Sequence, residues 1–186
     1  MLNFLHKLAL LLALGACSLT QAAVIGFDDP TAIEIDNDTG IATYRESGFA
    51  ISGIAGSFLP LDGIGSGMSG GLLSLSDSTV TLETINGATF SLAGLDAGAF
   101  DLMSGATLTL TAFFGDSQTS MVLALGELST FSFADWNGLS AVQFGASGDV
   151  VLDLLQVDAS AVPEPGSAML ALLGLALLAS ARKRRQ

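Results

Sequence analysis

The long central segment of this 186-residue chain lacks cysteine and histidine. The only cysteine, Cys17, and the only histidine, His6, both lie in an apolar segment at the N-terminal end. The central segment therefore has no thiol nucleophile, no imidazole base and none of the commonest zinc ligands, and it cannot form a disulfide framework. We expect a protein that is not an enzyme.

Positive charge is also scarce in the central segment. Arg45 is its only basic residue, whereas seventeen of the eighteen acidic residues lie between Asp28 and Asp158. One positive and seventeen negative side chains leave this segment a formal charge of −16. Binding a phosphate backbone requires clustered Lys and Arg. The composition therefore excludes nucleic acid as a partner, but it leaves divalent cations and neutral sugars open.

Residues 1–23 have the layout of a secretory signal peptide. His6 and Lys7 precede an apolar run over residues 8–16, and small residues follow as far as Ala23. A positive edge, a short apolar stretch and a small-residue cleavage region are typical of a signal that is removed on export. Cleavage after Ala22 or Ala23 fits best. Residues 14–17, Leu-Gly-Ala-Cys, also resemble a lipobox, so lipoprotein processing at Cys17 stays open as an alternative.

Residues 162–186 combine a proline motif, an apolar run and a basic end. The motif is Val162, Pro163, Glu164 and Pro165, and the basic end is Arg182, Lys183, Arg184 and Arg185. The prolines prevent a helix from starting earlier, and the basic end holds that side of the helix in the cytoplasm. About fourteen apolar residues, 168–181, are short for a stable membrane span, which suits a transient transmembrane anchor.

This order of motif, helix and basic end resembles the PEP-CTERM sorting signal. The resemblance implies export across the inner membrane of a Gram-negative bacterium and recognition by an exosortase, which is a membrane protease-transpeptidase. It also implies a transient stay in the inner membrane, followed by the cell surface or an extracellular polysaccharide matrix. We therefore divide the chain into a signal peptide (1–23), a folded domain (24–161) and a sorting signal (162–186).

The central segment consists of short runs rich in Thr, Val, Ile, Leu and Phe, separated by Gly, Asp, Asn and Ser. The runs are 24–27, 41–44, 49–51, 72–75, 80–84, 89–92, 107–113, 120–125, 129–133, 141–144 and 150–157. This pattern predicts an all-β fold, an antiparallel, jelly-roll-like β-sandwich. Polar and apolar residues alternate over 107–111, which places Leu108 and Leu110 on one buried face.

Turn residues separate most of these runs. Asn86-Gly87, Gly115-Asp116, Asn137-Gly138 and Gly148-Asp149 are dipeptides that supply the positive φ values of tight turns. The stretch 53–71, in which Gly and Ser dominate, is predicted to be a long surface loop.

Several short motifs of the central segment are similar to the β-sandwich domain common in PEP-CTERM proteins. They are Gly48-Phe49, residues 87–90 (Gly-Ala-Thr-Phe), residues 133–144 and residues 152–155 (Leu-Asp-Leu-Leu). The last motif departs from the family pattern, Leu-Asp-Asn-Ile, because Leu154 stands where Asn is usual.

The acidic residues are the main candidates for a site. Asp28 and Asp29 follow the first predicted strand, and Asp153 lies in the last. The first and last strands of a jelly roll are neighbours, so these carboxylates could bind one structural calcium ion, which takes six to eight oxygen ligands. Solvated aspartates at turns and edges are the alternative. No pair of carboxylates is flanked by the aromatic and polar residues that a glycosidase subsite needs.

Trp136 lies between Asp135 and Asn137, where it could stack on a sugar. A plug at one end of the sandwich is the alternative explanation for this ring. Two functions therefore stay open. The first is a structural protein of the cell surface or biofilm matrix, sorted by its tail and associated with extracellular polysaccharide. The second is a carbohydrate-binding module whose ligand is that polysaccharide.

Overall fold

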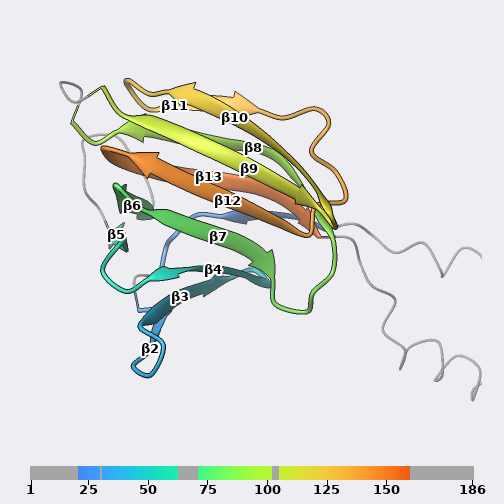
Figure 1. Cartoon of the computed structure of the whole chain (residues 1–186), viewed down its shortest axis with the longest axis horizontal. Helices are drawn as coiled ribbons and strands as arrows, with labels where there is room; N and C mark the ends of the chain where they lie inside the picture. The colour runs from blue at the N-terminus through green and yellow to red at the C-terminus, as the bar shows by residue number, and fades with distance from the viewer. Residues whose placement is uncertain (1–20, 30, 63–70, 102–104, 160–186) are drawn as a thin grey trace, which may run out of the picture. The chain divides into compact units, whose positions relative to one another are not determined.

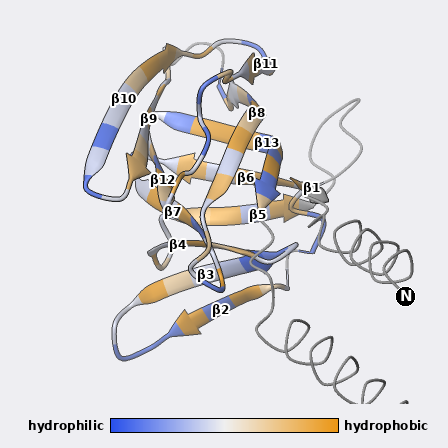
Figure 2. Cartoon of the chain, turned by 90° about the vertical axis from the view of Figure 1, so that its right-hand side faces the viewer, coloured by the Kyte–Doolittle hydropathy of each residue, from blue (hydrophilic) through white to orange (hydrophobic). Residues whose placement is uncertain are grey.

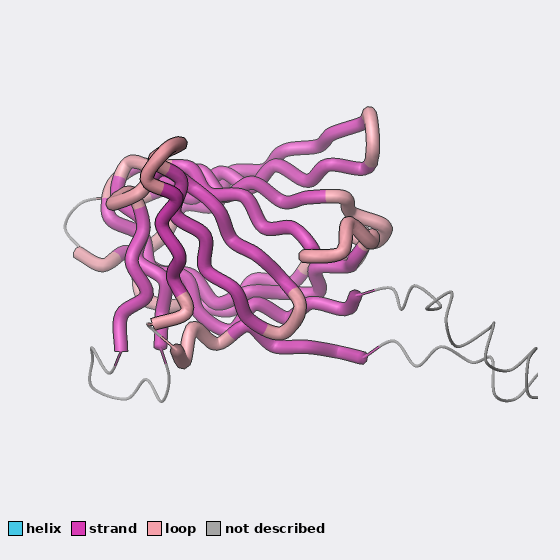
Figure 3. Tube along the Cα trace, turned by 90° about the horizontal axis from the view of Figure 1, so that it is seen from below, coloured by secondary structure: helices cyan, strands magenta, loops and turns pink. Residues whose placement is uncertain are grey.

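The computed structural model describes residues 21–29, 31–62, 71–101 and 105–159, and these form thirteen β-strands. Within these ranges the chain consists of strands and loops without a helix (Figure 3). The same ranges contain no helix long and apolar enough to cross a membrane. The predicted signal peptide up to residue 20, Cys17 and the predicted sorting signal lie outside the described residues.

The strands form two antiparallel sheets that face each other (Figure 1). The first sheet has the order β11-β8-β13-β6-β5, and β1 also pairs with β13. Its strands are β1 (Gln21–Ile25), β5 (Phe58–Asp62), β6 (Gly71–Ser76), β8 (Phe90–Ala99), β11 (Ser129–Ser132) and β13 (Asp149–Ala159).

The second sheet has the order β10-β9-β12-β7-β4-β3-β2. Its strands are β2 (Ile33–Asp36), β3 (Ile41–Glu46), β4 (Phe49–Ile54), β7 (Thr79–Thr84), β9 (Thr107–Phe114), β10 (Ser117–Ala124) and β12 (Ala141–Ser147). Two facing antiparallel sheets make the β-sandwich that the sequence predicts.

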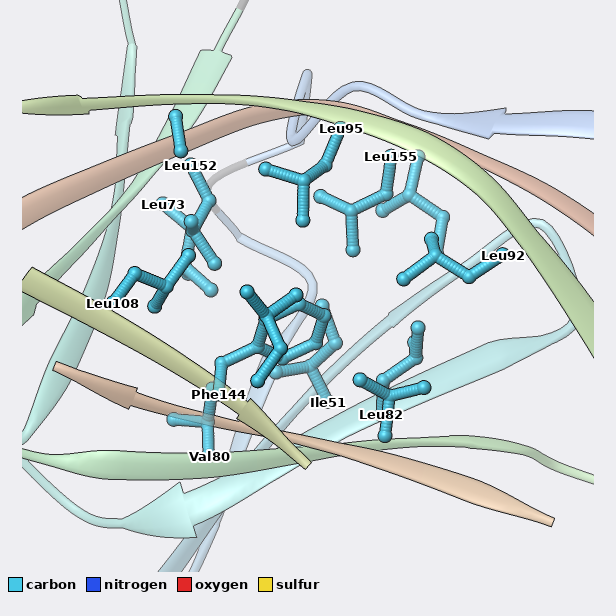
Figure 4. Packing of buried hydrophobic residues seen from close by; sticks show 14 of the residues in the cluster. Ile51, Leu73, Val80, Leu82, Leu92, Leu95, Leu108, Phe144, Leu152 and Leu155 are labelled. Carbon is cyan, nitrogen blue, oxygen red and sulfur yellow. The ribbon is translucent and has the colours of Figure 1, made fainter. Parts of the chain in front are cut away.

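The core lies between the two sheets, where alternate residues of each strand point inward. Figure 4 shows Leu152 and Leu155 from one sheet facing Val80, Leu82 and Phe144 from the other. In β9, Leu108 and Leu110 are fully buried and the threonines at 107, 109 and 111 are not, which confirms the predicted alternation. Burial of side chains of this size contributes about 1.5–3 kcal/mol each, so this layer is the main source of stability.

Each of the eleven predicted runs overlaps a strand, but two strands were not predicted. One is β2, and the other is β5, which lies inside the stretch 53–71 that was predicted to be a loop. That prediction is wrong for β5 because Phe58 is buried in the core and the strand pairs with β6 along its whole length. Pro60 is consistent with the position of β5 at the edge of the sheet, since proline within sheets is largely confined to edge strands.

The turns follow the dipeptides of the sequence. Gly115 has a φ of 63° in the two-residue connection that pairs Phe114 with Ser117, so β9 and β10 form a tight hairpin. Strand β1 begins at Gln21, three residues before the predicted start of the domain at Val24. All five of its residues have register partners in β13.

Candidate functional site

Strand β13 changes its neighbour on one side halfway along its length. Residues 149–152 pair with β6, whereas residues 155–159 pair with β1. Strand β8 lies along the other side of β13, and its register shifts between Asp153 and Gln156. Leu154 has a φ of 45° at this irregularity. An irregularity of this kind bends a strand and redirects its side chains, and such irregularities are common beside functional sites.

The chain comes into very close contact with itself where β1 ends and β6 begins. A Cβ atom on Gly71 would lie 1.8 Å from the carbonyl oxygen of Phe27, so only glycine fits at the first position of β6. The Gly71 N–H donates a hydrogen bond to Asp28 Oδ1 at 3.3 Å. Phe27 has a φ of 57° and is completely buried. These contacts fix the backbone of Asp28 beside β6.

Glu46, at the end of β3 in the second sheet, binds the segment that follows β1 in the first. Its Oε1 accepts a hydrogen bond from Gly26 N at 3.2 Å, and its Oε2 accepts one from Phe27 N at 3.0 Å. The Tyr44 hydroxyl also donates to Oε2, at 2.8 Å. Burial raises the pKa of Tyr44, and the hydrogen bond to the Glu46 carboxylate and its charge raise it further. The neutral phenol therefore stays a donor to Glu46.

Asp153 is the most buried carboxylate of the site, with 6% of its surface exposed. Its Oδ1 accepts a hydrogen bond from Leu154 N at 2.7 Å, and its cross-strand partner in β8 is Asp96. Burial raises the pKa of Asp153; the Leu154 N–H opposes this rise, and the charges of Asp96 and Asp28 add to it. Two carboxylates directly opposite each other repel, so this position favours a proton or a cation.

The structure brings together two of the three predicted calcium ligands. Asp28 and Asp153 are close enough for the charge of one to affect the other. Asp29 instead turns to Thr31, where its Oδ1 accepts hydrogen bonds from the backbone N at 2.9 Å and from Oγ1 at 2.6 Å. In the described part of the chain, no group of three or more His, Cys, Asp or Glu side chains is arranged to hold a metal ion. Calcium binding therefore stays a prediction.

Two residues of the site were not predicted from the sequence. Asp96 lies in the long strand β8, and its importance comes from the register that sets it opposite Asp153. Glu46 is nineteen residues from its partner Phe27 and lies in the other sheet. The pattern of a strand alone gives neither its register nor its pairing. The sequence Leu95-Asp96-Ala97 did offer one signal, because an acidic residue between two apolar residues of a strand indicates a special position.

Trp136 belongs to the hydrophobic core. Its side chain is 9% exposed and its ring stacks on Phe133, with centroids 4.7 Å apart and planes at 20°. Its carbonyl accepts a hydrogen bond from Leu92 N at 3.0 Å. This packing favours the alternative explanation of the ring, a plug of the sandwich core. Glycan contact through Trp136 stays a prediction.

The three comparisons differ in what they match. Residues 161–185 match the PEP-CTERM protein-sorting motif, and no curated protein sequence matches the chain. Among solved structures, TmCBM61 in complex with β-1,4-galactotriose is 12% identical, with a TM-score of 0.41, and the match covers 66% of this chain and 93% of that one. The carbohydrate-binding module TmCBM27, described as recognising mannan, is 10% identical, with a TM-score of 0.35 and coverages of 75% and 99%.

The agarase AgWH50C is 9% identical, with a TM-score of 0.36, and the match covers 77% of this chain and 25% of that one. All these TM-scores lie below 0.5, and the two antiparallel sheets themselves define the fold. The sorting motif is different, because it covers nearly the whole of the predicted tail. The chain is therefore a PEP-CTERM domain-containing protein, with its motif at residues 161–185.

Proposed function

We propose that an exosortase recognises the C-terminal tail of this protein after export, and that the β-sandwich then serves as a structural component of the cell surface or extracellular matrix. The observation that carries the proposal is the match of residues 161–185 to the PEP-CTERM motif. The basic residues 182–185 close this segment and hold it at the cytoplasmic side while the folded domain lies on the other side.

The chemistry of the folded domain supports a role without catalysis. Residues 21–159 contain neither cysteine nor histidine. The half-buried Glu46 and the buried Asp153 both have structural contacts: Glu46 accepts hydrogen bonds from the backbone N–H groups of Gly26 and Phe27, and Asp153 accepts one from the N–H of Leu154. A formal charge of −16 on this part of the chain keeps it soluble and repels anionic lipid headgroups.

The second hypothesis, a carbohydrate-binding module, requires a surface that can bind a sugar ring. Exposed tyrosine and tryptophan rings are well suited to this, since each combines an apolar face with a polar tip. The chain has one tryptophan and one tyrosine, and both are buried: Trp136 at 9% exposed and Tyr44 at 1%. This burial favours the structural role, and polysaccharide association then depends on other contacts.

Intact-mass measurement on protein recovered from exporting cells tests the proposal. We expect a mass that lacks both the N-terminal signal and the apolar tail. The same spectrum distinguishes cleavage near residue 23 from lipid attachment at Cys17, because a lipid adds mass. A variant with Pro163→Ala, Glu164→Ala and Pro165→Ala should keep its tail and remain in the membrane fraction.

The matched control is a triple alanine variant of exposed residues in the folded domain, Asp38, Asp116 and Asp135, which should be processed like the wild type. A wild-type protein recovered with both ends intact, or recovered from the cytosol, would contradict the proposal. For the second hypothesis, retention on the host polysaccharide that Trp136→Ala abolishes in a folded protein would replace the structural role with glycan recognition.

A further inference from the structure

The edges of the two sheets are unequally protected against pairing with another strand. Natural edge strands are commonly short, or they carry charges or proline, because an open row of N–H and C=O groups invites association. Strands β2 and β11 have four residues each, and β1 and β5 have five. Strand β2 also carries Glu34 and Asp36, and β5 carries Pro60.

Strand β10 lacks all of these protections. It is an edge strand of eight residues, Ser-Gln-Thr-Ser-Met-Val-Leu-Ala, with no charge and no proline. All of its residues are exposed except Leu123, which is half-buried, and Val122 is 65% exposed. Figure 2 shows β10 at one side of the molecule, with its hydrophobic part at the end away from the hairpin turn. A neutral edge is unusual on so acidic a domain.

The register of the β9–β10 hairpin shows which groups of β10 face outward. Leu125 N donates to Ala106 O at 3.0 Å, just beyond the last register pair, Ala124 with Thr107. Hydrogen-bonded and non-bonded pairs alternate along an antiparallel ladder. The odd-numbered residues of β10 therefore bond to β9, and the backbone N–H and C=O groups of Ser120, Val122 and Ala124 point to the open edge.

We infer that β10 pairs with β10 of a second copy of this chain, antiparallel, with Val122 on the twofold axis. A twofold axis perpendicular to the sheet sets Val122 opposite its own copy, and the outward N–H and C=O of both residues then bond to each other. In the same register, Met121 lies opposite Leu123 of the second copy. The two seven-stranded sheets become one continuous sheet across the dimer.

This register matches the side chains of β10 better than registers shifted toward the hairpin turn do. With Ser120 on the axis, Val122 would lie opposite the polar Gln118, and with Met121 on the axis it would lie opposite Ser120. The arrangement centred on Val122 places apolar groups against apolar groups on both faces of the sheet. An axis at Leu123 would also do so, but it sets Val122 against the single methyl group of Ala124, so the axis at Val122 gives the larger apolar pair among the residues whose backbone groups face outward. No charged residue lies within β10, so the acidic surfaces of the two copies meet only beyond its ends.

Disulfide cross-linking in cells that export the full chain tests the inference. Residues of a hydrogen-bonded antiparallel pair have Cα atoms about 5.5 Å apart, inside the range that a disulfide spans. Val122→Cys should therefore give a cross-linked dimer on a non-reducing gel, since exported cysteines meet an oxidising environment. The wild type, whose only cysteine is Cys17, sets the background.

Gln118→Cys is the matched control, because Gln118 is exposed on the same strand and has the same orientation as Val122. In the proposed register its copy lies eight residues away along the strand, about 27 Å, which is too far for a disulfide. We expect about tenfold more dimer from Val122→Cys than from Gln118→Cys, because pairing raises the effective concentration of the first thiol only. Equal yields from the two variants, or a yield from Val122→Cys at the wild-type background, would overturn the inference.

The inference rests on the fold and not on the proposed sorting. Its failure would show in the cross-linking yield, whereas failure of the proposed function would show in the mass of the recovered protein. A dimer held by the sheet edge would give the exported domain a way to form larger structural units.

Discussion

At the scale of single residues, Leu154 has a backbone conformation that leucine rarely adopts. Its φ of 45° lies in the left-handed region, and its side chain is 40% exposed. Asn is enriched in that region, and it is the residue that the motif resembled by residues 152–155 would have here. Leu154 therefore stands where asparagine would fit the backbone conformation better.

We predict that Leu154→Asn raises the free energy of unfolding by about 0.5–1 kcal/mol, because it relieves part of the left-handed penalty. Leu154→Ala is the control, since it removes the same apolar side chain without favouring that conformation, and it should lower stability. Urea unfolding of the purified proteins measures both. An Asn variant no more stable than the Ala variant would show that the positive φ carries no cost.

The raised pKa of Asp153 should make the stability of the folded domain decrease as pH rises, which is unusual for an aspartate. Burial raises its pKa in the folded state above the unfolded value of 3.8, so the folded state binds the proton more tightly. The stability contributed by this group is therefore fully present below the unfolded pKa and is lost as pH rises through the folded pKa. Asp153→Asn keeps an oxygen for the Leu154 N–H and removes the charge opposite Asp96.

We predict that Asp153→Asn is more stable than the wild type at pH 7 by about 0.5–1 kcal/mol, the size of a cross-strand charge pair, and that the difference shrinks below pH 4. Asp135→Asn, at an exposed loop position, is the control and should leave the pH profile unchanged. Thermal melting from pH 3 to pH 8 in EDTA gives the comparison. A constant difference at every pH would argue against ionisation as its cause.

Calcium is the other way to relieve the repulsion around Asp153. For a dissociation constant of about 1 mM, usual for extracellular sites, 10 mM calcium would stabilise the folded wild type by about 1.4 kcal/mol. We predict this gain for the wild type and its loss in Asp153→Asn. Asp29→Asn should keep it, because Asp29 is turned to Thr31. Melting temperatures that calcium leaves unchanged in all three proteins would remove the calcium site.

At the scale of elements, Glu46 holds the end of β1 in place. Its carboxylate accepts hydrogen bonds from Gly26 N, Phe27 N and the Tyr44 hydroxyl, and thereby connects β3 of one sheet with the chain that leaves β1 of the other. Removing the carboxylate leaves these donors without their partner. A buried polar group left unpaired costs about 1–3 kcal/mol.

We predict that Glu46→Ala lowers the free energy of unfolding by about 3 kcal/mol and increases hydrogen exchange of the β1 amides first. Glu46→Gln, which keeps one acceptor oxygen, should lose less. Glu83→Ala, a change of the same type at an exposed position of β7, is the control and should be nearly neutral. Uniform exchange along the first sheet in Glu46→Ala would contradict a local role for this residue.

The elements also show what the sequence could and could not predict. Strands with regular alternation, such as β9, were predictable because their burial follows directly from a period of two. Strand β5 was missed because its flanks are rich in Gly and Ser and it contains Pro60, signals of a loop that pairing with β6 overrides. Asp28 and Asp153 lie close enough for the charge of one to affect the other, whereas the partner Asp96 depends on register, which local sequence does not encode.

At the scale of the whole molecule, charge of one sign dominates the folded domain. Residues 21–159 hold one arginine and seventeen carboxylates, and the described residues contain a single ion pair, Arg45 with Glu34 at 3.3 Å. Both side chains of that pair are largely exposed, so it contributes little. The balance of surface charge is therefore repulsive, and repulsion of this kind weakens a compact state.

We predict that raising sodium chloride from about 0.02 M to 0.5 M raises the melting temperature by about 3 °C, because the Debye length falls well below the spacing of most surface charges. EDTA in both buffers excludes calcium as the cause. A variant with Asp38→Lys, Asp116→Lys and Asp135→Lys, all at exposed turns, removes six units of net negative charge and should show a smaller salt effect. If salt instead lowered the melting temperature of the wild type, specific ion pairs would outweigh the repulsion, and the acidic composition would have to be explained by an interaction that neutralises it.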